Sequence, residues 1–212
     1  PNSVTAYGND LMQLSDFLGK QRLVTGVSAE DIRSCIGKLS SEKKASSSIN
    51  RFIAAVRTFF AYCRKFEYIQ NNPALEVKTV KLPKHLPRFL TGPEVDELCE
   101  APEKNELLWE TRDKAILEML YSSGCRVSEI ASLCLEDFTG GYESAIVTGK
   151  GKKDRQVYFE EDARKCLEAY LADRKKMFAK LGKKDDVKEL FVNQRGTALA
   201  ARGIRWIIAR YS

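Results

Sequence analysis

The stretch Tyr121-Ser-Ser-Gly-Cys-Arg-Val-Ser-Glu-Ile130 joins two segments that each have the apolar pattern of a helix. Apolar residues recur at helical spacing before it, at Ala115, Ile116, Met119 and Leu120, and again after it, at Val127, Ile130 and Leu133. The Ser-Ser-Gly sequence between them is typical of a helix break. Arg126 is therefore expected at the start of the second helix, held between two segments that face the core.

Glu129 follows Arg126 by three residues, which places the two side chains on the same face of a helix. Such a pair stabilises a helix start in many proteins, and it also occurs where an arginine is held in a fixed position for binding an anion. The spacing alone leaves both interpretations open.

The pattern changes after Phe138. Residues 145–148 and 155–159 are short and rich in β-formers, and between them lies the turn Gly149-Lys-Gly-Lys-Lys-Asp154. This arrangement predicts a β-hairpin. Because clustered lysines repel one another, the composition of the tip favours a loop that faces phosphate over one that stabilises the fold.

Helices are expected on both sides of this hairpin. Thr91-Gly-Pro-Glu94 has the form of a capping box at the start of a helix. A long helix is predicted over residues 160–181, followed by a short extended piece and turn at 190–196. A last helix from Thr197 would carry Arg202 and Arg205 on its outer face.

The first part of the chain predicts a helical unit of about 75 residues with four helices. Its strongest segment, residues 46–66, has one apolar stripe and an outer face with Arg51 and Arg57. Ser46 and Ser47 at the start of this helix would offer hydroxyl and N–H groups to a phosphate. The arginines either follow a DNA backbone or only solvate the outer face. Residues 77–90 read as an extended linker with a basic edge.

The charge distribution separates the two parts of the chain. Residues 1–89 contain 14 Lys and Arg against 7 Asp and Glu, whereas the remaining residues contain 21 against 22. A basic first part is expected of a protein that binds a polyanion, although a basic solvated face would have the same composition.

Composition excludes several other classes. The hydrophobic content of 43% and charged content of 30% are typical of a soluble globular protein, and no apolar run is long enough to span a bilayer. The six cysteines form no C-x-x-C pair and the single histidine is His85, so we expect no metal site. Free thiols suit a reducing cytoplasm, and we expect no membrane association.

Several motifs taken together resemble the tyrosine recombinases, most closely the Xer-type members. The resemblance covers nearly the whole chain, in order. It rests on Ala45-Ser-Ser-Ser-Ile with Arg51 and Ala-Val-Arg57-Thr-Phe-Phe-Ala-Tyr62, Lys81-Leu-Pro-Lys-His-Leu-Pro87, Gly124-Cys-Arg-Val-Ser-Glu-Ile130, Gly149-Lys-Gly-Lys-Lys-Asp-Arg155 and Leu190-Phe-Val-Asn-Gln-Arg-Gly196.

The resemblance implies a mainly α fold with a four-helix SAM-like core-binding domain (1–76), a basic linker (77–89) and a mixed α+β catalytic domain with a small antiparallel hairpin or sheet (90–212). It implies an enzyme that cuts and rejoins duplex DNA through a 3′-phosphotyrosyl intermediate. No cofactor is needed, because the covalent intermediate conserves the energy of the phosphoester bond.

The same resemblance assigns roles to individual residues. Arg126 matches the first catalytic arginine, Glu129 the acid that supports it, and Lys150 the lysine that protonates the leaving 5′-oxygen. The expected DNA-binding residues, from both parts of the chain, are Ser46, Ser47, Arg51, Arg57, Lys78, Lys81, Lys84, Lys152, Arg155, Arg202 and Arg205.

The sequence departs from the family in its last part. It contains no His-x-x-Arg segment, no later His or Trp of the active site and no tyrosine at the position of the nucleophile. Tyr211 precedes the place where the His-x-x-Arg segment would begin, so it is not expected to attack DNA. The expectation is a partial catalytic domain, inactive by itself, from a protein that works as a homo- or hetero-tetramer on two DNA sites.

Three functions fit these observations. A Xer-like recombinase would resolve chromosome or plasmid dimers or integrate and excise mobile DNA. A non-catalytic DNA-binding relative would share the motifs but lack the nucleophile. A topoisomerase-like relative would share the chemistry but would explain the basic N-terminal unit less readily.

Overall fold

The computed structural model describes residues 2–83, 89–105, 109–149, 151 and 153–212. Contacts between residues divide the chain into two units, Pro1–Pro87 and Arg88–Ser212. Each unit has its own buried apolar core.

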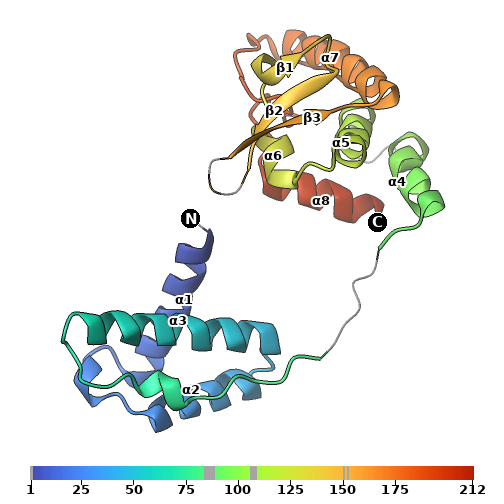
Figure 1. Ribbon diagram of the computed structural model, residues 1–212. Coiled ribbons are helices and arrows are strands. Elements are labelled where there is room, and N and C mark those ends of the chain that lie inside the picture. The colour runs from blue at the N-terminus through green and yellow to red at the C-terminus, as the bar shows by residue number, and fades with distance from the viewer. Residues whose placement is uncertain (1, 84–88, 106–108, 150, 152) are drawn as a thin grey trace. The chain divides into compact units, whose positions relative to one another are not determined.

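The first unit contains the helices α1 (Asn2–Leu18), α2 (Ala29–Ser41) and α3 (Ser46–Lys65) and the 3₁₀ turns η1 (Val24–Gly26) and η2 (Pro73–Glu76). The helices α1 and α2 both pack against α3 (Figure 1). Four helices were predicted for this unit. Among its described residues there are three α-helices, and the helical segment after α3 is only the 3₁₀ turn η2. The apolar stripe of α3 predicted from sequence forms the centre of the core, where Phe52, Ile53 and Val56 are fully buried.

The first residues of the expected linker pack on this unit. Val77 is buried, and Val80 packs against the same core. The Asn50 side chain holds the backbone of Val80 on both sides: its Nδ2 donates to the Val80 carbonyl (2.8 Å) and its Oδ1 accepts from the Val80 N–H (2.7 Å). Residues 77–80 are therefore bound to α3 and are not a free linker.

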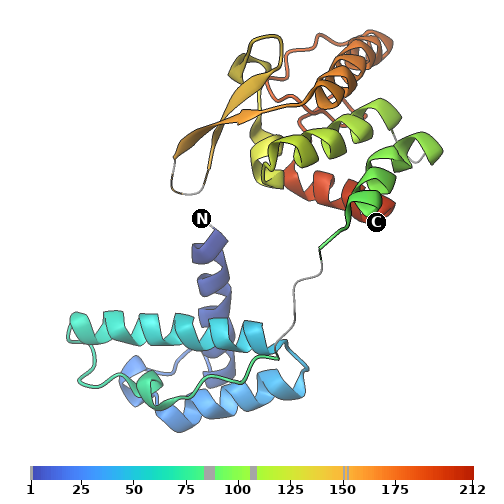
Figure 2. The ribbon, with the colours of Figure 1, turned by 45° about the vertical axis from the view of Figure 1, so that its right-hand side comes forward.

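The second unit contains five helices among its described residues, together with the 3₁₀ turn η3 (Leu135–Asp137): α4 (Gly92–Lys104), α5 (Glu110–Ser123), α6 (Val127–Ser132), α7 (Glu161–Leu181) and α8 (Ala201–Tyr211). The helix α5 contacts each of the other four helices and strand β3. Figures 1 and 2 both show α8 on the side of α5 and α6 away from the sheet.

The sheet has the strand order β1-β2-β3, with antiparallel pairing throughout. The predicted hairpin is confirmed as β2 (Ser144–Thr148) and β3 (Asp154–Tyr158). The short strand β1 (Phe138–Thr139) was not predicted, because two residues are too few to show an alternating pattern.

The last helix begins four residues later than the prediction from Thr197. Residues 197–199 form strand-like bonds instead: the Asn193 N–H donates to the Thr197 carbonyl (2.8 Å) and the Leu199 N–H donates to the Phe191 carbonyl (2.8 Å). Pairing with a distant segment thus competes successfully with the local helical pattern.

Candidate active site

Arg126 is fixed at a sharp exit from α5. Gly124 ends that helix in the left-handed region, with φ +59°, and its N–H donates to the Leu120 carbonyl (3.1 Å). Glycine occupies this region without the steric cost that other residues have. Cys125 is buried and Ile130 is fully buried. Arg126 itself is the N-cap of α6, so its backbone is anchored on both sides.

Glu129 is the centre of a cluster with two arginines. The Arg126 N–H donates to Glu129 Oε2 (2.8 Å) and Arg126 Nη1 donates to Glu129 Oε1 (2.8 Å). Arg155 donates to Glu129 Oε2 through Nη1 (3.2 Å) and Nη2 (3.0 Å). The Glu129 side chain is 3% exposed, whereas those of Arg126 and Arg155 are 66% and 40% exposed. The carboxylate is thus buried beneath two guanidinium groups that face solvent.

The register of the hairpin brings Arg155 to this cluster. Arg155 pairs with Val147 across the strands, and Val157 pairs with Ala145. These four residues share one face of the sheet because side chains alternate along a strand. From the sequence Arg155 is expected to contact the DNA backbone, and its bond to Glu129 was not predicted. The apolar Val157 and Phe159 at alternating positions could have indicated that Arg155 lies on the same face of the strand as these two residues.

The base of the hairpin tip touches the same cluster. A Cβ atom on Gly149 would lie 3.3 Å from Glu129 Oε1 and 3.8 Å from Arg126 Nη1. The Gly149 N–H donates to the Lys153 carbonyl (2.8 Å) and closes the turn. A glycine is therefore suited to this close approach. Lys150 and Lys152, which follow Gly149 in the tip, lie outside the described residues.

The charges in the cluster set the state of Glu129. Burial would raise the pKa of this carboxyl, but the bonds from the Arg126 N–H and guanidinium and the charge of Arg155 lower it below its ordinary value. Glu129 is therefore ionised at neutral pH. An ionised carboxylate holds one edge of the Arg126 guanidinium and leaves the exposed remainder available to an anion.

The two arginines expected on the outer face of α3 bind within their own unit. Arg51 donates through Nε and Nη2 to the buried Asp10 (2.9 Å for each), and this pairing raises the pKa of Arg51. Arg57 donates to the carbonyl of Ala74 (3.2 Å) and to that of Val77. Both arginines thus hold the first unit together, a role that sequence analysis did not assign. Their binding to DNA stays a prediction.

Other predicted DNA-binding residues have accessible positions. Ser46 and Ser47 form the first turn of α3, after Ala45, whose side chain accepts no hydrogen bond. Lys78, Lys81, Arg202 and Arg205 are exposed. Lys84 lies outside the described residues.

The Tyr211 hydroxyl is bound within the protein, which argues against nucleophilic attack by this residue. Its hydroxyl donates to Asp113 Oδ2 (3.1 Å). Burial and the neighbouring Asp113 raise the pKa of the Tyr211 hydroxyl to about 12. Its phenolate is therefore harder to form than that of an ordinary tyrosine.

A buried charged network around Asp113 was missed in the sequence. Arg112 Nε donates to Asp113 Oδ1 (2.8 Å), and Arg112 Nη1 donates to the Val192 carbonyl (3.4 Å). Two adjacent charged residues in a helix give no sequence signal that distinguishes them from a solvated pair.

Two other kinds of feature are absent from the described part of the chain. No group of His, Cys, Asp and Glu side chains is arranged to hold a metal ion. None of the helices there combines the length and the apolar character that crossing a membrane requires.

Comparison with protein families gives two matches that together span most of the chain. Residues 88–212 match the Phage integrase family, and residues 1–65 match the Phage integrase N-terminal SAM-like domain.

Individual relatives agree with these matches. The chain is 39% identical to tyrosine recombinase XerC of Treponema denticola, over 99% of this chain and 71% of the relative. It is 36% identical to tyrosine recombinase XerC of Oceanobacillus iheyensis, over 98% of this chain and 68% of the relative.

Solved structures share the fold. A lambda integrase dimer bound to a COC′ core site has a TM-score of 0.74 at 14% identity, covering 99% of this chain and 70% of that one. The XerH site-specific recombinase bound to a palindromic difH substrate has a TM-score of 0.69 at 20% identity, covering 98% of this chain and 62% of that one.

Proposed function

Because the chain belongs to the phage integrase family, whose relatives include tyrosine recombinases, we propose that it is a site-specific tyrosine recombinase that cuts and rejoins duplex DNA. The observation that carries this proposal is the cluster of Arg126, Glu129 and Arg155 at the base of the hairpin. It presents an exposed guanidinium held by a buried carboxylate.

The proposed chemistry is a transesterification at a phosphodiester. A tyrosine hydroxyl attacks phosphorus, a 3′-phosphotyrosyl bond forms, and the bond to the 5′-oxygen breaks. Negative charge increases on the non-bridging oxygens as the transition state forms. Arg126 stabilises that charge, because a fork of N–H donors in a fixed position needs no reorganisation when the charge develops.

Glu129 and Arg155 are positioning residues in this proposal. Glu129 orients one edge of the Arg126 guanidinium, and Arg155 holds the second carboxylate oxygen of Glu129. Lys150 is the proposed general acid, which transfers a proton to the leaving 5′-oxygen. Gly149, which precedes Lys150 in the sequence, lies beside the cluster.

Residues 1–212 hold only part of this machinery. The family's His-x-x-Arg segment and nucleophilic tyrosine have no counterpart in this sequence. We therefore propose that these residues bind duplex DNA and contact the phosphate, but form no covalent intermediate by themselves.

Both units are proposed to contact the duplex. In the first unit the contacts come from the start of α3 and the basic segment 77–89, and in the second unit from the hairpin tip and from Arg202 and Arg205. We propose that the first unit is the core-binding domain and the second unit the catalytic domain. In the assembled state we propose a tetramer on two DNA sites, which agrees with the DNA-bound dimers and tetramers among the structural neighbours.

The cellular role proposed first is resolution of chromosome or plasmid dimers, because the relatives at 33–39% identity are named XerC. Integration or excision of mobile DNA is the alternative, since transposon and phage integrases share the fold. A non-catalytic DNA-binding relative would keep the DNA contacts, but would not need the buried Glu129 beneath Arg126.

Salt-dependent binding of duplex DNA tests the proposal on this chain. Each phosphate contact releases counterions, so log Kd should rise linearly with log[salt], and replacing two contacts by Lys78→Ala and Lys81→Ala should reduce the slope by about 2. Fluorescence anisotropy of a labelled duplex measures both quantities. Lys165→Ala, which removes an exposed lysine paired with Glu161, is the matched control. Binding that does not depend on salt would contradict the proposal.

A further inference from the structure

The buried network of Arg112, Asp113 and Tyr211 has no part in the chemistry described above. The side chains of Arg112 and Asp113 are 3% and 0% exposed, so neither can reach a DNA phosphate. A buried ion pair is often no more stabilising than apolar residues of similar volume. Stability alone therefore does not account for two adjacent buried charges on α5.

The network links three parts of the second unit. Arg112 and Asp113 lie on α5, the helix whose other end leads into the turn that holds Arg126. Arg112 reaches the carbonyl of Val192, and its guanidinium lies over the Trp109 ring at 5.3 Å from the ring centre. Asp113 Oδ2 receives the hydroxyl of Tyr211, the last residue of α8.

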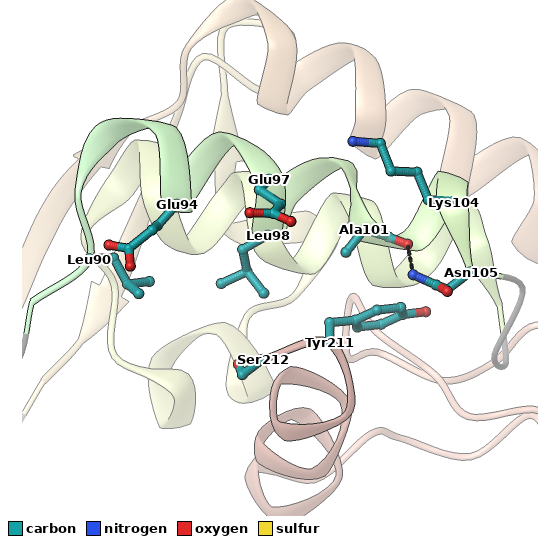
Figure 3. A pocket seen from close by; sticks show the side chains of 9 residues that line it. All are labelled: Leu90, Glu94, Glu97, Leu98, Ala101, Lys104, Asn105, Tyr211 and Ser212. Atoms are coloured by element: carbon teal, nitrogen blue, oxygen red, sulfur yellow. Dashed lines mark hydrogen bonds between the residues drawn. The ribbon is translucent and has the colours of Figure 1, made fainter.

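The last turn of α8 packs against the core through Ile208 and Tyr211 and faces α4 across a pocket. A pocket of about 580 Å³ lies between α4 and this end, lined by Leu98 and Ala101 on one side and by Tyr211 and Ser212 on the other. Figure 3 shows these side chains around the pocket.

The packing of the inner face of α8 determines the direction in which its outer face points. Ile204 and Ile207 are buried on the inner side, and the Tyr211 hydroxyl extends the same contact to the last turn. Arg202 precedes Tyr211 by nine residues, about two and a half helical turns, so the two side chains point in opposite directions. A rotation of α8 would therefore move Tyr211 and the exposed Arg202 together.

We propose that Asp113 is a positioning residue for DNA binding: through the Tyr211 hydroxyl it fixes the end and the rotation of α8, and thereby aims Arg202 and Arg205 at the duplex. The inference rests on the proposed function, because it takes the outer face of α8 as a DNA contact. Arg112 in turn holds the Asp113 carboxylate in the orientation that receives the hydroxyl.

The test uses Tyr211→Phe in the 212-residue chain, because this substitution removes only the hydroxyl. Binding of a labelled duplex should weaken about threefold to tenfold, the range expected for the loss of one typical intramolecular hydrogen bond. The exposed Tyr158 on strand β3 provides the matched control, and Tyr158→Phe should leave the affinity unchanged.

A double-mutant cycle separates positioning from a general loss of stability. In a background with Arg202→Ala and Arg205→Ala, Tyr211→Phe should have no further effect on DNA affinity, because the groups that it aims are gone. Equal weakening in both backgrounds, or no weakening in the parent chain, overturns the proposal.

A measurement without DNA distinguishes failure of this inference from failure of the proposed function. Hydrogen exchange of the α8 amides should become faster in Tyr211→Phe and stay unchanged in Tyr158→Phe. Unchanged α8 exchange in Tyr211→Phe overturns the anchoring. A parent chain that shows no salt-dependent DNA binding overturns the proposed function instead.

Discussion

Glu129 and Asp113 are buried carboxylates in the same unit, and each is paired with arginine, yet their surroundings differ. The arginines bound to Glu129 are exposed to solvent, whereas Arg112, bound to Asp113, is buried with it. Glu129 therefore holds positively charged guanidinium groups that an external anion can contact. The Asp113–Arg112 pair is enclosed by the protein, and Asp113 Oδ2 accepts the Tyr211 hydroxyl.

The pKa values follow this difference. Hydrogen bonds from Arg126 and the charge of Arg155 lower the pKa of Glu129 despite its burial, whereas burial raises the pKa of Asp113 despite Arg112. The comparison teaches that an Arg–carboxylate pair marks a binding site when its guanidinium is exposed, and marks a structural support when it is buried.

The largest expected effect is on stability, at the buried pair. Arg112→Ala leaves the Asp113 charge buried without its main partner and should lower the free energy of unfolding by about 3–5 kcal/mol. Both tryptophans, Trp109 and Trp206, lie in the second unit, so their fluorescence during urea denaturation reports on it. Arg195→Ala, at an exposed arginine of the same unit, should cost less than about 0.5 kcal/mol. Similar losses in the two variants would contradict the assignment of Arg112 as a structural support.

The next effect is on activity, at the exposed pair. The assay uses a fusion in which a segment with the His-x-x-Arg motif and the tyrosine expected of the family follows Ser212. In this fusion Arg126→Ala should reduce covalent trapping on a nicked duplex about 10²–10³-fold, because a preorganised charge is lost from the transition state.

The stability of the Arg126→Ala variant should change little, since the side chain is mostly exposed. Arg126→Lys keeps the charge but loses the fork of donors, so the amount of trapping should lie between that of the parent fusion and that of Arg126→Ala. Undiminished trapping in Arg126→Ala would remove Arg126 from the chemistry and erase the contrast with Arg112.

A smaller effect is expected at Arg155, which acts through Glu129. Arg155→Ala leaves Arg126 bound to the carboxylate, so trapping in the same fusion should fall about tenfold, as expected when a catalytic group is slightly misplaced. The neighbouring Gln156 lies on the opposite face of β3, and Gln156→Ala should have no such effect. A loss as large as that of Arg126→Ala would mean that Arg155 itself contacts the phosphate.

The smallest effect is on pH dependence, and its sign separates the two carboxylates. A lowered pKa in Glu129 means that its contribution to stability is present above its unfolded pKa, about 4.3, and is lost as the pH falls through its folded value. A raised pKa in Asp113 means that folding favours its protonated form, so its contribution becomes more favourable as the pH falls.

Urea denaturation between about pH 3.5 and 7 measures both contributions. The difference in stability between the parent chain and Glu129→Gln should shrink as the pH falls, whereas the difference between the parent chain and Asp113→Asn should shift in favour of the parent. Slopes of the same sign would contradict the comparison.

Much of the fold could be predicted because its signals are local. The stripe of α3, the capping box at Thr91, the break at Gly124 and the hairpin around Gly149 all follow from spacing and turn chemistry within a few residues. The start of α8 was misplaced because Leu199 bonds to Phe191, a partner in a different segment. The strand β1 was missed because it consists of two residues.

The candidate site was predicted in part. Arg126 and Glu129 lie three residues apart, so their pairing follows from helix geometry. Arg155 joins them only through the register of the hairpin. The bonds of Arg51 to Asp10 and of Arg57 to residues 74 and 77 depend on how α1 and η2 pack on α3, and sequence periodicity shows only that these arginines leave the apolar stripe.

The sequence by itself determined the family, the order of the helices and the pair Arg126–Glu129, because each depends on residues close together in the chain. Only the tertiary structure decided which arginines are exposed and which are internal supports. Exposure depends on what distant segments cover, and the same residue type at the same helical spacing can face either solvent or the core. Asp113 shows this most clearly: its neighbours in sequence suggest a solvated charge, and its neighbours in space make it a buried support for α8.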